Sequence, residues 1–222
     1  MLTYLIFVVP PALLAMYAQA ILKSRYAKAQ KAPCQYTGYQ AARAILDSAG
    51  LQSVQIERIA GSLTDHYDPR AKVLRLSENS YSGHNLASVG VAAHEAGHAI
   101  QDASHYKLMV LRQMAVPLAS LGSNSAMALI VAGAALQITG LLLAGVAAFG
   151  MVALFQIINL PVEYDASSRA KKLLGSLGFV PAKDAPIVKG VLSAAALTYV
   201  AAMLSSVAVF LYYLLSATRS RD

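Results

Sequence analysis

A run of 50 consecutive residues, 113–162, contains no charged side chain, and this run constrains the fold more than any other feature of the sequence. A single α-helix of that length would extend about 75 Å, whereas the hydrocarbon core of a bilayer is only about 30 Å thick. The run therefore predicts two membrane-spanning helices joined by a turn. The sequence Gln-Ile-Thr-Gly at 137–140 is the best place for the turn, which predicts a helical hairpin over about 110–160.

Two further stretches, 2–22 and 190–218, also contain no Asp, Glu, Lys or Arg. Each is long enough to cross the bilayer once, for which about 20 apolar residues suffice. The first stretch has no basic residues before it and is too long for the apolar part of a signal peptide. We therefore expect a spanning helix there, kinked or divided at Pro10 and Pro11. Together with the hairpin, these stretches predict a mainly α integral membrane protein with about four transmembrane helices.

The composition agrees with a membrane protein, because 57% of the residues are hydrophobic and only 13% are charged, which is outside the usual range of soluble domains. The formal net charge of +7 does not indicate a nucleic-acid-binding protein, since the sequence has no basic stripe interleaved with aromatic residues and no nucleic-acid motif. The single cysteine, Cys34, cannot form a disulfide within the chain.

The positive charges lie mainly between the predicted spans. Eleven of the 18 Lys and Arg residues lie in 23–112 and five lie in 163–189, whereas only Arg219 and Arg221 follow the last span. By the positive-inside rule both polar segments are cytoplasmic, and both chain ends lie outside. The expected order is a transmembrane helix in 1–22, a cytoplasmic domain in 23–109, the hairpin in 110–160, a cytoplasmic segment in 161–189 and a transmembrane helix in 190–218.

The first part of the cytoplasmic domain shows signals for a helix and a small sheet. Thr37 is a good N-cap for a helix that ends near Ser48. The segments Val54–Ile59 and Lys72–Leu76 have the pattern of short strands, with the turn signal Tyr-Asp-Pro-Arg between them. We therefore expect these two strands to form a β-hairpin.

The last helix of this domain, predicted over about 86–103 after an N-cap at Asn85, carries the sequence His94-Glu95-Ala96-Gly97-His98. Residues four apart lie on the same face of a helix, one turn from each other, so the two imidazoles can bind one metal ion. H-E-x-x-H on a helix is the pattern of zinc peptidases, in which the ion activates a water molecule and the glutamate takes its proton. The motif predicts a site for one Zn²⁺ ion, with Glu95 as general base in peptide-bond hydrolysis.

Two histidines on a buried, metal-free helix are the competing interpretation of this motif. With this composition the motif arises by chance roughly twice in a thousand chains. The helix around it is apolar, and burial of two imidazoles and a carboxylate costs free energy unless a partner such as a metal ion compensates. We therefore favour the zinc site.

A catalytic zinc ion normally has three protein ligands and an open fourth position, so one ligand must come from elsewhere in the chain. It must lie on the same membrane face as His94, and the helical hairpin returns the chain to that face. Glu163, the first charged residue after the hairpin, is therefore the preferred third ligand. Asp165 is the main alternative, and the less favoured candidates are His66, His84, His105 and Asp102.

Asp102 and Asp165 are weaker ligand candidates than Glu163 for different reasons. Asp102 lies about 12 Å along the helix from His94, which is too far to share its ion unless the helix breaks. Asp165 is expected either to orient the imidazole of a ligand or to form an ordinary ion pair with Arg169, four residues later.

Three segments together resemble the family of YugP-like membrane zinc metallopeptidases. They are LTDHYDPR at 63–70, VGVAAHEAGHAIQ at 89–101 and LPVEYDAS at 160–167. The resemblance covers nearly the whole chain. It implies a gluzincin-like α+β catalytic domain with a small sheet, a bacterial inner-membrane location, and peptide or protein substrates, among them membrane proteins in quality control.

The order of these segments is also similar to that of membrane proteases of the HtpX type, in which a helical hairpin separates the two histidines from a glutamate ligand. This likeness implies that Glu163 is the third zinc ligand. Those proteases have an aspartate four residues after the glutamate, whereas this chain has Ser167 at that position and Asp165 two residues after the glutamate.

Two further roles are hypotheses. In such folds a strand beside the motif helix pairs with an extended substrate, and Lys72–Leu76, with Leu74 at its centre, is the best candidate. His66 or Tyr67 is a candidate for stabilising the oxyanion of the tetrahedral intermediate, although a turn-forming role for both is the simpler expectation.

Two functions other than a peptidase are also compatible with parts of the sequence. The first is a catalytically inactive, zinc-stabilised membrane scaffold or adaptor, which needs the metal ligands but not Glu95. The second is a transporter, which is disfavoured because the uncharged runs contain no intramembrane acid or base to relay ions.

Overall fold

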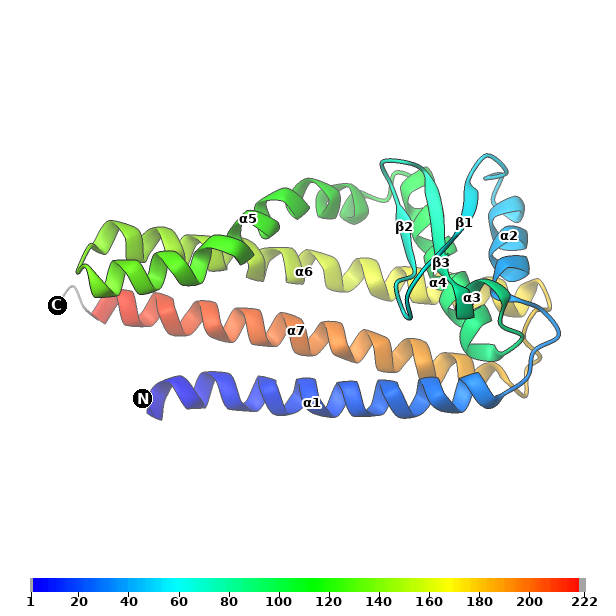
Figure 1. Ribbon diagram of the computed structural model, residues 1–222, viewed down its shortest axis with the longest axis horizontal. Helices are drawn as coiled ribbons and strands as arrows, with labels where there is room; N and C mark the ends of the chain where they lie inside the picture. Colours follow the sequence, from blue (N-terminus) through cyan, green and yellow to red (C-terminus); the bar gives the residue numbers. More distant parts are fainter. Residues whose placement is uncertain (1, 220–222) are drawn as a thin grey trace. The chain divides into compact units, whose positions relative to one another are not determined.

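The structure is a computed structural model that describes residues 2–219 (Figure 1). Its elements are α1 (Leu2–Lys31), α2 (Gly38–Ser48), β1 (Gln55–Ile59), β2 (His66–Asp68), β3 (Val73–Ser77), α3 (Glu78–Ser82), α4 (Leu86–Ala103), α5 (Lys107–Ala135), α6 (Thr139–Ser176) and α7 (Ala185–Arg219). The chain divides into two compact units. The first contains the chain up to Ala18, Leu108–Pro161 and the chain from Leu197, and the second contains Gln19–Lys107 and Val162–Ala196.

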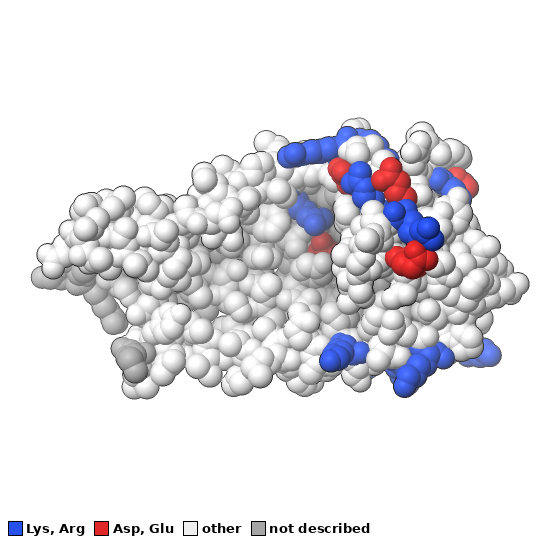
Figure 2. All heavy atoms as spheres, viewed as in Figure 1, with Lys and Arg blue, Asp and Glu red and all other residues white. Residues whose placement is uncertain are grey.

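Four helices are long and apolar enough to cross a membrane, namely α1, α5, α6 and the part of α7 up to Ala217. The predicted mainly helical fold with about four candidate spans is therefore confirmed for the described residues. α1 is continuous through Pro10 and Pro11, so these prolines do not divide it. In Figure 2 no charged atoms are visible over the turn between α5 and α6 or the helix ends beside it, as the uncharged run requires. Arg221 lies outside the described residues.

Small residues allow α5 and α6 to pack closely in the first unit. α5 ends at Ala135 and α6 begins at Thr139, so the turn lies at 136–138 and overlaps the predicted position at 137–140. A Cβ added to Gly122 would lie 2.5 Å from the carbonyl oxygen of Ala148, so a larger residue at 122 would force the two helices apart. The hairpin therefore depends on backbone-to-backbone contact.

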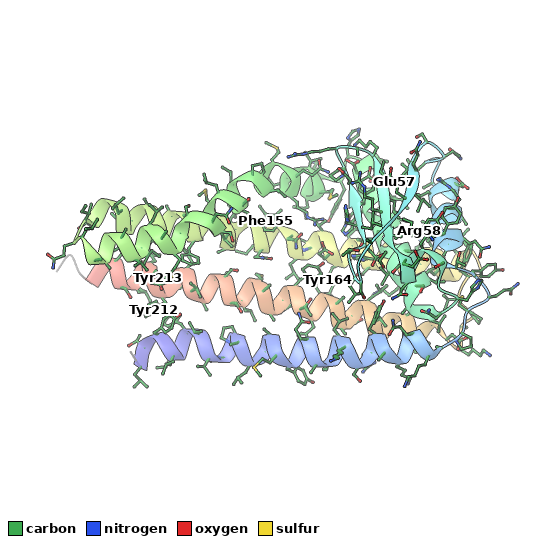
Figure 3. The ribbon with its side chains drawn as sticks, in the orientation of Figure 1. Glu57, Arg58, Phe155, Tyr164, Tyr212 and Tyr213 are labelled. Carbon is green, nitrogen blue, oxygen red and sulfur yellow. The ribbon has the colours of Figure 1, made fainter. Side chains whose placement is uncertain are left out.

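Tyr212 and Tyr213 of α7 (Figure 3) contact aromatic rings of two other helices of the first unit. The ring of Tyr212 lies 5.0 Å from that of Tyr4 in an edge-on arrangement, and the ring of Tyr213 stacks on Phe149 at 5.7 Å. Such contacts stabilise helix packing beyond the area that they bury.

The second unit contains a three-stranded sheet in the order β1-β3-β2. β1 pairs with β3 in parallel. The predicted hairpin between Val54–Ile59 and Lys72–Leu76 is therefore wrong, because the strands of a hairpin are antiparallel. The antiparallel neighbour of β3 is β2, which has only three residues, too few for a recognisable alternation of polar and apolar side chains.

The turn between β2 and β3 is held by the carboxylate of Asp68. It accepts hydrogen bonds from Arg75 at 2.7 Å and from the backbone N–H groups of Arg70 and Ala71. The bond from Arg75, followed by these backbone bonds, lowers the pKa of Asp68 to about 2. Lys72 completes the turn with a left-handed φ of 56°. These contacts fix β2 against β3.

α2 packs closely on α3 and α4 and thereby supports the motif helix. Thr37 accepts a hydrogen bond from the Gln40 N–H, and its own N–H donates to the Gln40 side chain, which confirms the predicted N-cap as a capping box. A Cβ on Gly38 would overlap the carbonyl oxygen of Ser80 and lie 2.7 Å from that of Ser88. Only glycine allows this approach.

α4 begins after Asn85, as predicted, because the Asn85 side chain accepts a hydrogen bond from the Ser88 N–H. α6 differs from the prediction, since it continues through Pro161 to Ser176. Glu163 therefore lies on a continuous helix rather than in a separate segment after the hairpin. Both helices are continuous at the residues that form the site described next.

Candidate metal centre

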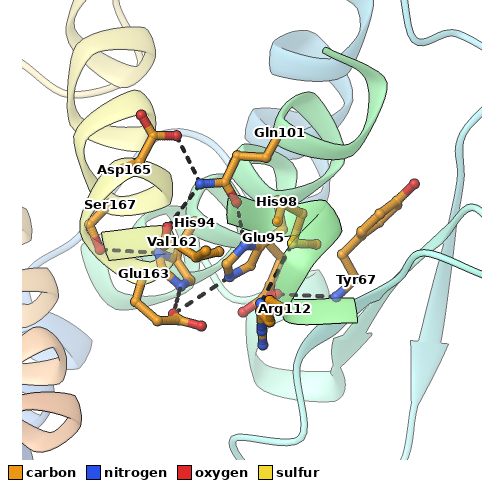
Figure 4. Close-up of polar contacts among 11 residues, drawn as sticks. Tyr67, His94, Glu95, His98, Gln101, Arg112, Val162, Glu163, Asp165 and Ser167 are labelled. Atoms are coloured by element: carbon orange, nitrogen blue, oxygen red, sulfur yellow. Dashed lines mark hydrogen bonds and ion pairs between the residues drawn. The ribbon is translucent and has the colours of Figure 1, made fainter. Parts of the chain in front are cut away.

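α4 and α6 bring two histidines and one glutamate together in the second unit (Figure 4). One carboxylate oxygen of Glu163 lies 3.2 Å from His94 Nε2 and 3.6 Å from His98 Nε2. One possible ligand atom from each residue lies within 4.8 Å of the other two. The Glu163 side chain is only 2% exposed. The cluster has the size and the donor atoms that a single small cation requires.

A glycine inside the motif determines how closely the two helices approach. A Cβ on Gly97 would lie 2.8 Å from the carbonyl oxygen of Ala166. The neighbouring residues Ala93, Ala96 and Val162 are also small and fully buried. Because α4 and α6 meet backbone to backbone here, the short Glu163 side chain reaches both imidazoles.

Gln101 fixes the orientation of His98. Its side-chain oxygen lies 2.9 Å from His98 Nδ1, and its amide nitrogen donates to the Val162 carbonyl and to the Asp165 carboxylate, both at 2.8 Å. Since both amide hydrogens are used in this way, the oxygen must face His98 and must accept a hydrogen bond from Nδ1–H. His98 Nε2 then carries a lone pair that points at Glu163.

This arrangement tests whether the cluster fits a cation. His98 Nε2 and the Glu163 carboxylate are both hydrogen-bond acceptors, and in the structure they face each other inside the protein. Two buried acceptors at 3.6 Å repel unless a proton or a metal cation lies between them. Two imidazoles and a carboxylate are the donor set of catalytic zinc sites. The residues present therefore fit a zinc ion.

Ser167 and Asp165 surround the cluster from α6. The hydroxyl of Ser167, four residues after Glu163, lies 3.2 Å from His94 Nδ1. Asp165 contacts Gln101 and also pairs with Arg169 at 2.5 Å. Asp165 thus forms the expected ion pair with Arg169, and it reaches His98 only through Gln101 rather than by direct contact with the imidazole.

The side chain of Glu95 is held by the small sheet. The backbone N–H of Tyr67 in β2 donates a hydrogen bond to the Glu95 carboxylate at 3.1 Å. The hydroxyl of Tyr67 donates to Asp102 at 2.7 Å, and its ring points away from the histidines in Figure 4. Burial and this hydrogen bond raise the pKa of Tyr67 well above its ordinary value. The hydroxyl is therefore a protonated donor to Asp102, and the contact of Tyr67 with the site is through its backbone.

The other candidates from the sequence lie outside the cluster. Asp102 binds Tyr67 and Lys72. His66 is exposed, with Nδ1 2.8 Å from the Thr64 carbonyl, and His84 Nδ1 lies 3.2 Å from the Gln35 carbonyl. His105 is exposed in the turn after α4, two residues beyond Ala103. Among the described residues, only His94, His98 and Glu163 form a group with metal-binding geometry.

The hypothesis that Lys72–Leu76 pairs with a substrate strand is corrected by the sheet. β3 is the central strand, with β1 on one side and β2 on the other. Where β3 continues past the end of the shorter strand β2, the N–H of Ser77 donates to the Asp65 carboxylate. Leu74 itself is fully buried. β3 therefore has no free edge, and the edge strand that contacts Glu95 is β2.

Ser167 has no role in the sequence analysis, and Gln101 was missed altogether. Gln101 lies three residues after His98, so it shares a helix face with that histidine. A polar residue at this spacing on an otherwise apolar helix is the signal that would have identified it, since buried amides need partners.

Comparison with known proteins gives the family. The family described as "Putative neutral zinc metallopeptidase" matches residues 4–218. The chain belongs to this family. It is also similar to the "Putative membrane protease YugP" of Bacillus subtilis (strain 168), with 42% identity over 211 residues, which is 94% of each chain. No solved structure matches. Membership of this family of zinc metallopeptidases implies that the metal is zinc and that the substrates are peptides.

We expect Gln101→Met to weaken zinc binding by about 10- to 100-fold, because His98 loses the acceptor that holds its ring and its tautomer. The measurement is competition for zinc between the full-length protein in detergent and a chromophoric chelator. Gln30→Met is the matched control, since Gln30 is exposed on α1. Equal zinc affinity for the two variants would show that Gln101 does not orient the histidine.

Proposed function

We propose that this member of the family is a zinc-dependent endopeptidase that cleaves peptide bonds with Glu95 as general base. The observation that supports this proposal best is the convergence of His94, His98 and Glu163, with the Glu95 carboxylate held beside them by the Tyr67 N–H. A zinc ion bound there would polarise the scissile carbonyl and lower the pKa of water. The fold around it is proposed to be gluzincin-like.

Each residue of the site has its own proposed role. His94, His98 and Glu163 would hold the ion, and Ser167 and Gln101 hold the rings of the two histidines. The Glu95 carboxylate accepts a proton from the attacking water and delivers it to the amine that leaves. Because the Tyr67 N–H occupies one Glu95 oxygen, the carboxylate has a fixed orientation, which lowers the entropic cost of the proton transfer.

The position of the site along α6 supports substrates at the membrane. Glu163 directly follows the uncharged run that ends at residue 162, so a ligand of the metal lies at the end of a candidate span. Peptide segments close to the membrane surface are therefore the best proposed substrates, which agrees with a role in membrane-protein quality control.

The decisive variant is Glu95→Gln. We expect it to bind zinc like the wild type and to lose at least about 100-fold in the rate of casein or membrane-peptide cleavage, because the amide cannot accept the proton. Glu78→Gln, at an exposed position of α3, is the matched control and is expected to cleave normally. Equal rates for wild type and Glu95→Gln would contradict the proposal and would favour an inactive zinc-stabilised scaffold or adaptor.

We also propose that the site faces the cytoplasm, because 16 of the 18 Lys and Arg residues lie in the two segments that contain it. Single cysteines at Lys28 and at Gln137, each in a Cys34→Ser background, test this orientation in intact cells with a membrane-impermeant maleimide. We expect labelling at 137 in intact cells and at 28 only after permeabilisation. The opposite pattern would reverse the topology.

A further inference from the structure

A groove of about 290 Å³ lies between α1 and α7 in the second unit, away from the metal-binding cluster. Two cationic side chains, Arg25 and Lys189, line it together with apolar and small residues, among them Ile21, Ser193 and Ala194. Within residues 2–219, no acidic side chain lines it. In Figure 2 only Lys and Arg atoms, and no Asp or Glu atoms, are visible along the lower edge, where Figure 1 places α1.

The two cations of this groove have no partner within the part of the chain that the structure describes. Neither an ion pair nor a side-chain hydrogen bond involves Arg25 or Lys189 among residues 2–219. Asp65 is the acidic residue whose charge acts on Tyr26, which is next to Arg25 in the sequence. Its carboxylate accepts hydrogen bonds from Ser77 and not from Arg25. Two unpaired cations on facing helices repel each other, so the groove has a charge that an anion would complement.

Gly190 brings the Arg25 guanidinium close to α7. A Cβ on Gly190 would lie 2.9 Å from Arg25 Nη1. The Arg25 guanidinium therefore lies over the α7 backbone at Gly190, which directly follows Lys189. Both cationic side chains line the same groove. A guanidinium and an ammonium that converge in this way are suited to a phosphate group.

The groove lies at a defined depth along both candidate spans. Arg25 follows the uncharged stretch 2–22 by three residues, and Lys189 directly precedes the uncharged stretch 190–218. Ile21 and Ala194 belong to these uncharged stretches. The groove is thus cationic at the ends of the uncharged stretches and apolar within them. A phospholipid has the same arrangement, with a charged head group followed by apolar acyl chains.

We propose that this groove binds one anionic phospholipid. Arg25 and Lys189 bind the phosphate, the Ser193 hydroxyl donates a hydrogen bond to it, and the acyl chains leave past Ile21 and Ala194. A net negative head group is preferred over a zwitterionic one, because two cations are opposed by no acid in the groove.

The experiment uses the full-length protein in nanodiscs of equal parts phosphatidylglycerol and phosphatidylcholine, with retained lipid counted by native mass spectrometry after release. We expect one phosphatidylglycerol to remain bound to the wild type. The double variant Arg25→Gln/Lys189→Gln is expected to retain it about 30-fold less tightly, because each removed cation weakens binding to an anionic lipid. Gly190→Leu, which fills the groove without a change in charge, is expected to lose the lipid as well.

The matched control is Lys28→Gln/Lys183→Gln, which removes the same charge from two exposed positions outside the groove and is expected to retain the lipid. Far-UV circular dichroism checks that each variant is folded. If Gly190→Leu does not fold, the test rests on the double variant Arg25→Gln/Lys189→Gln alone. Equal retention by both double variants would overturn the proposal in favour of general attraction to the surface. Equal displacement by water-soluble glycerol phosphate would overturn it in favour of a site for free phosphate.

Discussion

The close packing of α4 against α6 at Gly97 is the contact on which the rest of the site depends. The backbone of Ala166 lies so near that a single methyl group at position 97 would meet its carbonyl oxygen at 2.8 Å. A carboxylate on α6 reaches two imidazoles on α4 only at this separation. The middle of the H-E-x-x-H motif thus has a steric role in addition to the metal-binding and catalytic roles proposed for its other residues.

The contacts around the cluster explain how a charged group is tolerated in an almost fully buried position. Glu163 is 2% exposed, and a buried carboxylate costs several kcal/mol unless it is paired. Both histidine rings are held from behind, His98 by Gln101 and His94 by Ser167. Their Nε2 atoms therefore face Glu163, and a bound cation would satisfy all three groups at once.

The sequence predicted the local features well because local chemistry determines them. The capping residues Thr37 and Asn85, the turn between α5 and α6, and the helix that carries the two histidines all depend on neighbours within a few residues. Glu163 was selected by a topological argument, and the structure places it beside the histidines. The selection rested on a hairpin of two candidate spans, which would return the chain to the side on which it started.

The remaining features depend on contacts between distant segments. The parallel pairing of β1 with β3 could not be predicted, since β2 has three residues and its role as the hairpin partner appears only when the sheet forms. For the same reason Leu74, which has a suitable strand pattern, is buried in a central strand. Gln101 was missed because its importance comes from Val162 and Asp165, which lie about 60 residues away in the sequence.

X-ray absorption spectroscopy at the zinc K-edge tests the central claim most directly, on full-length protein loaded with zinc. The account predicts one zinc ion per chain with two imidazole nitrogens and carboxylate or water oxygen at about 2.0 to 2.2 Å, and a change in the first coordination shell in Glu163→Ala. A spectrum that Glu163→Ala leaves unchanged, or a shell with one histidine or none, would contradict it.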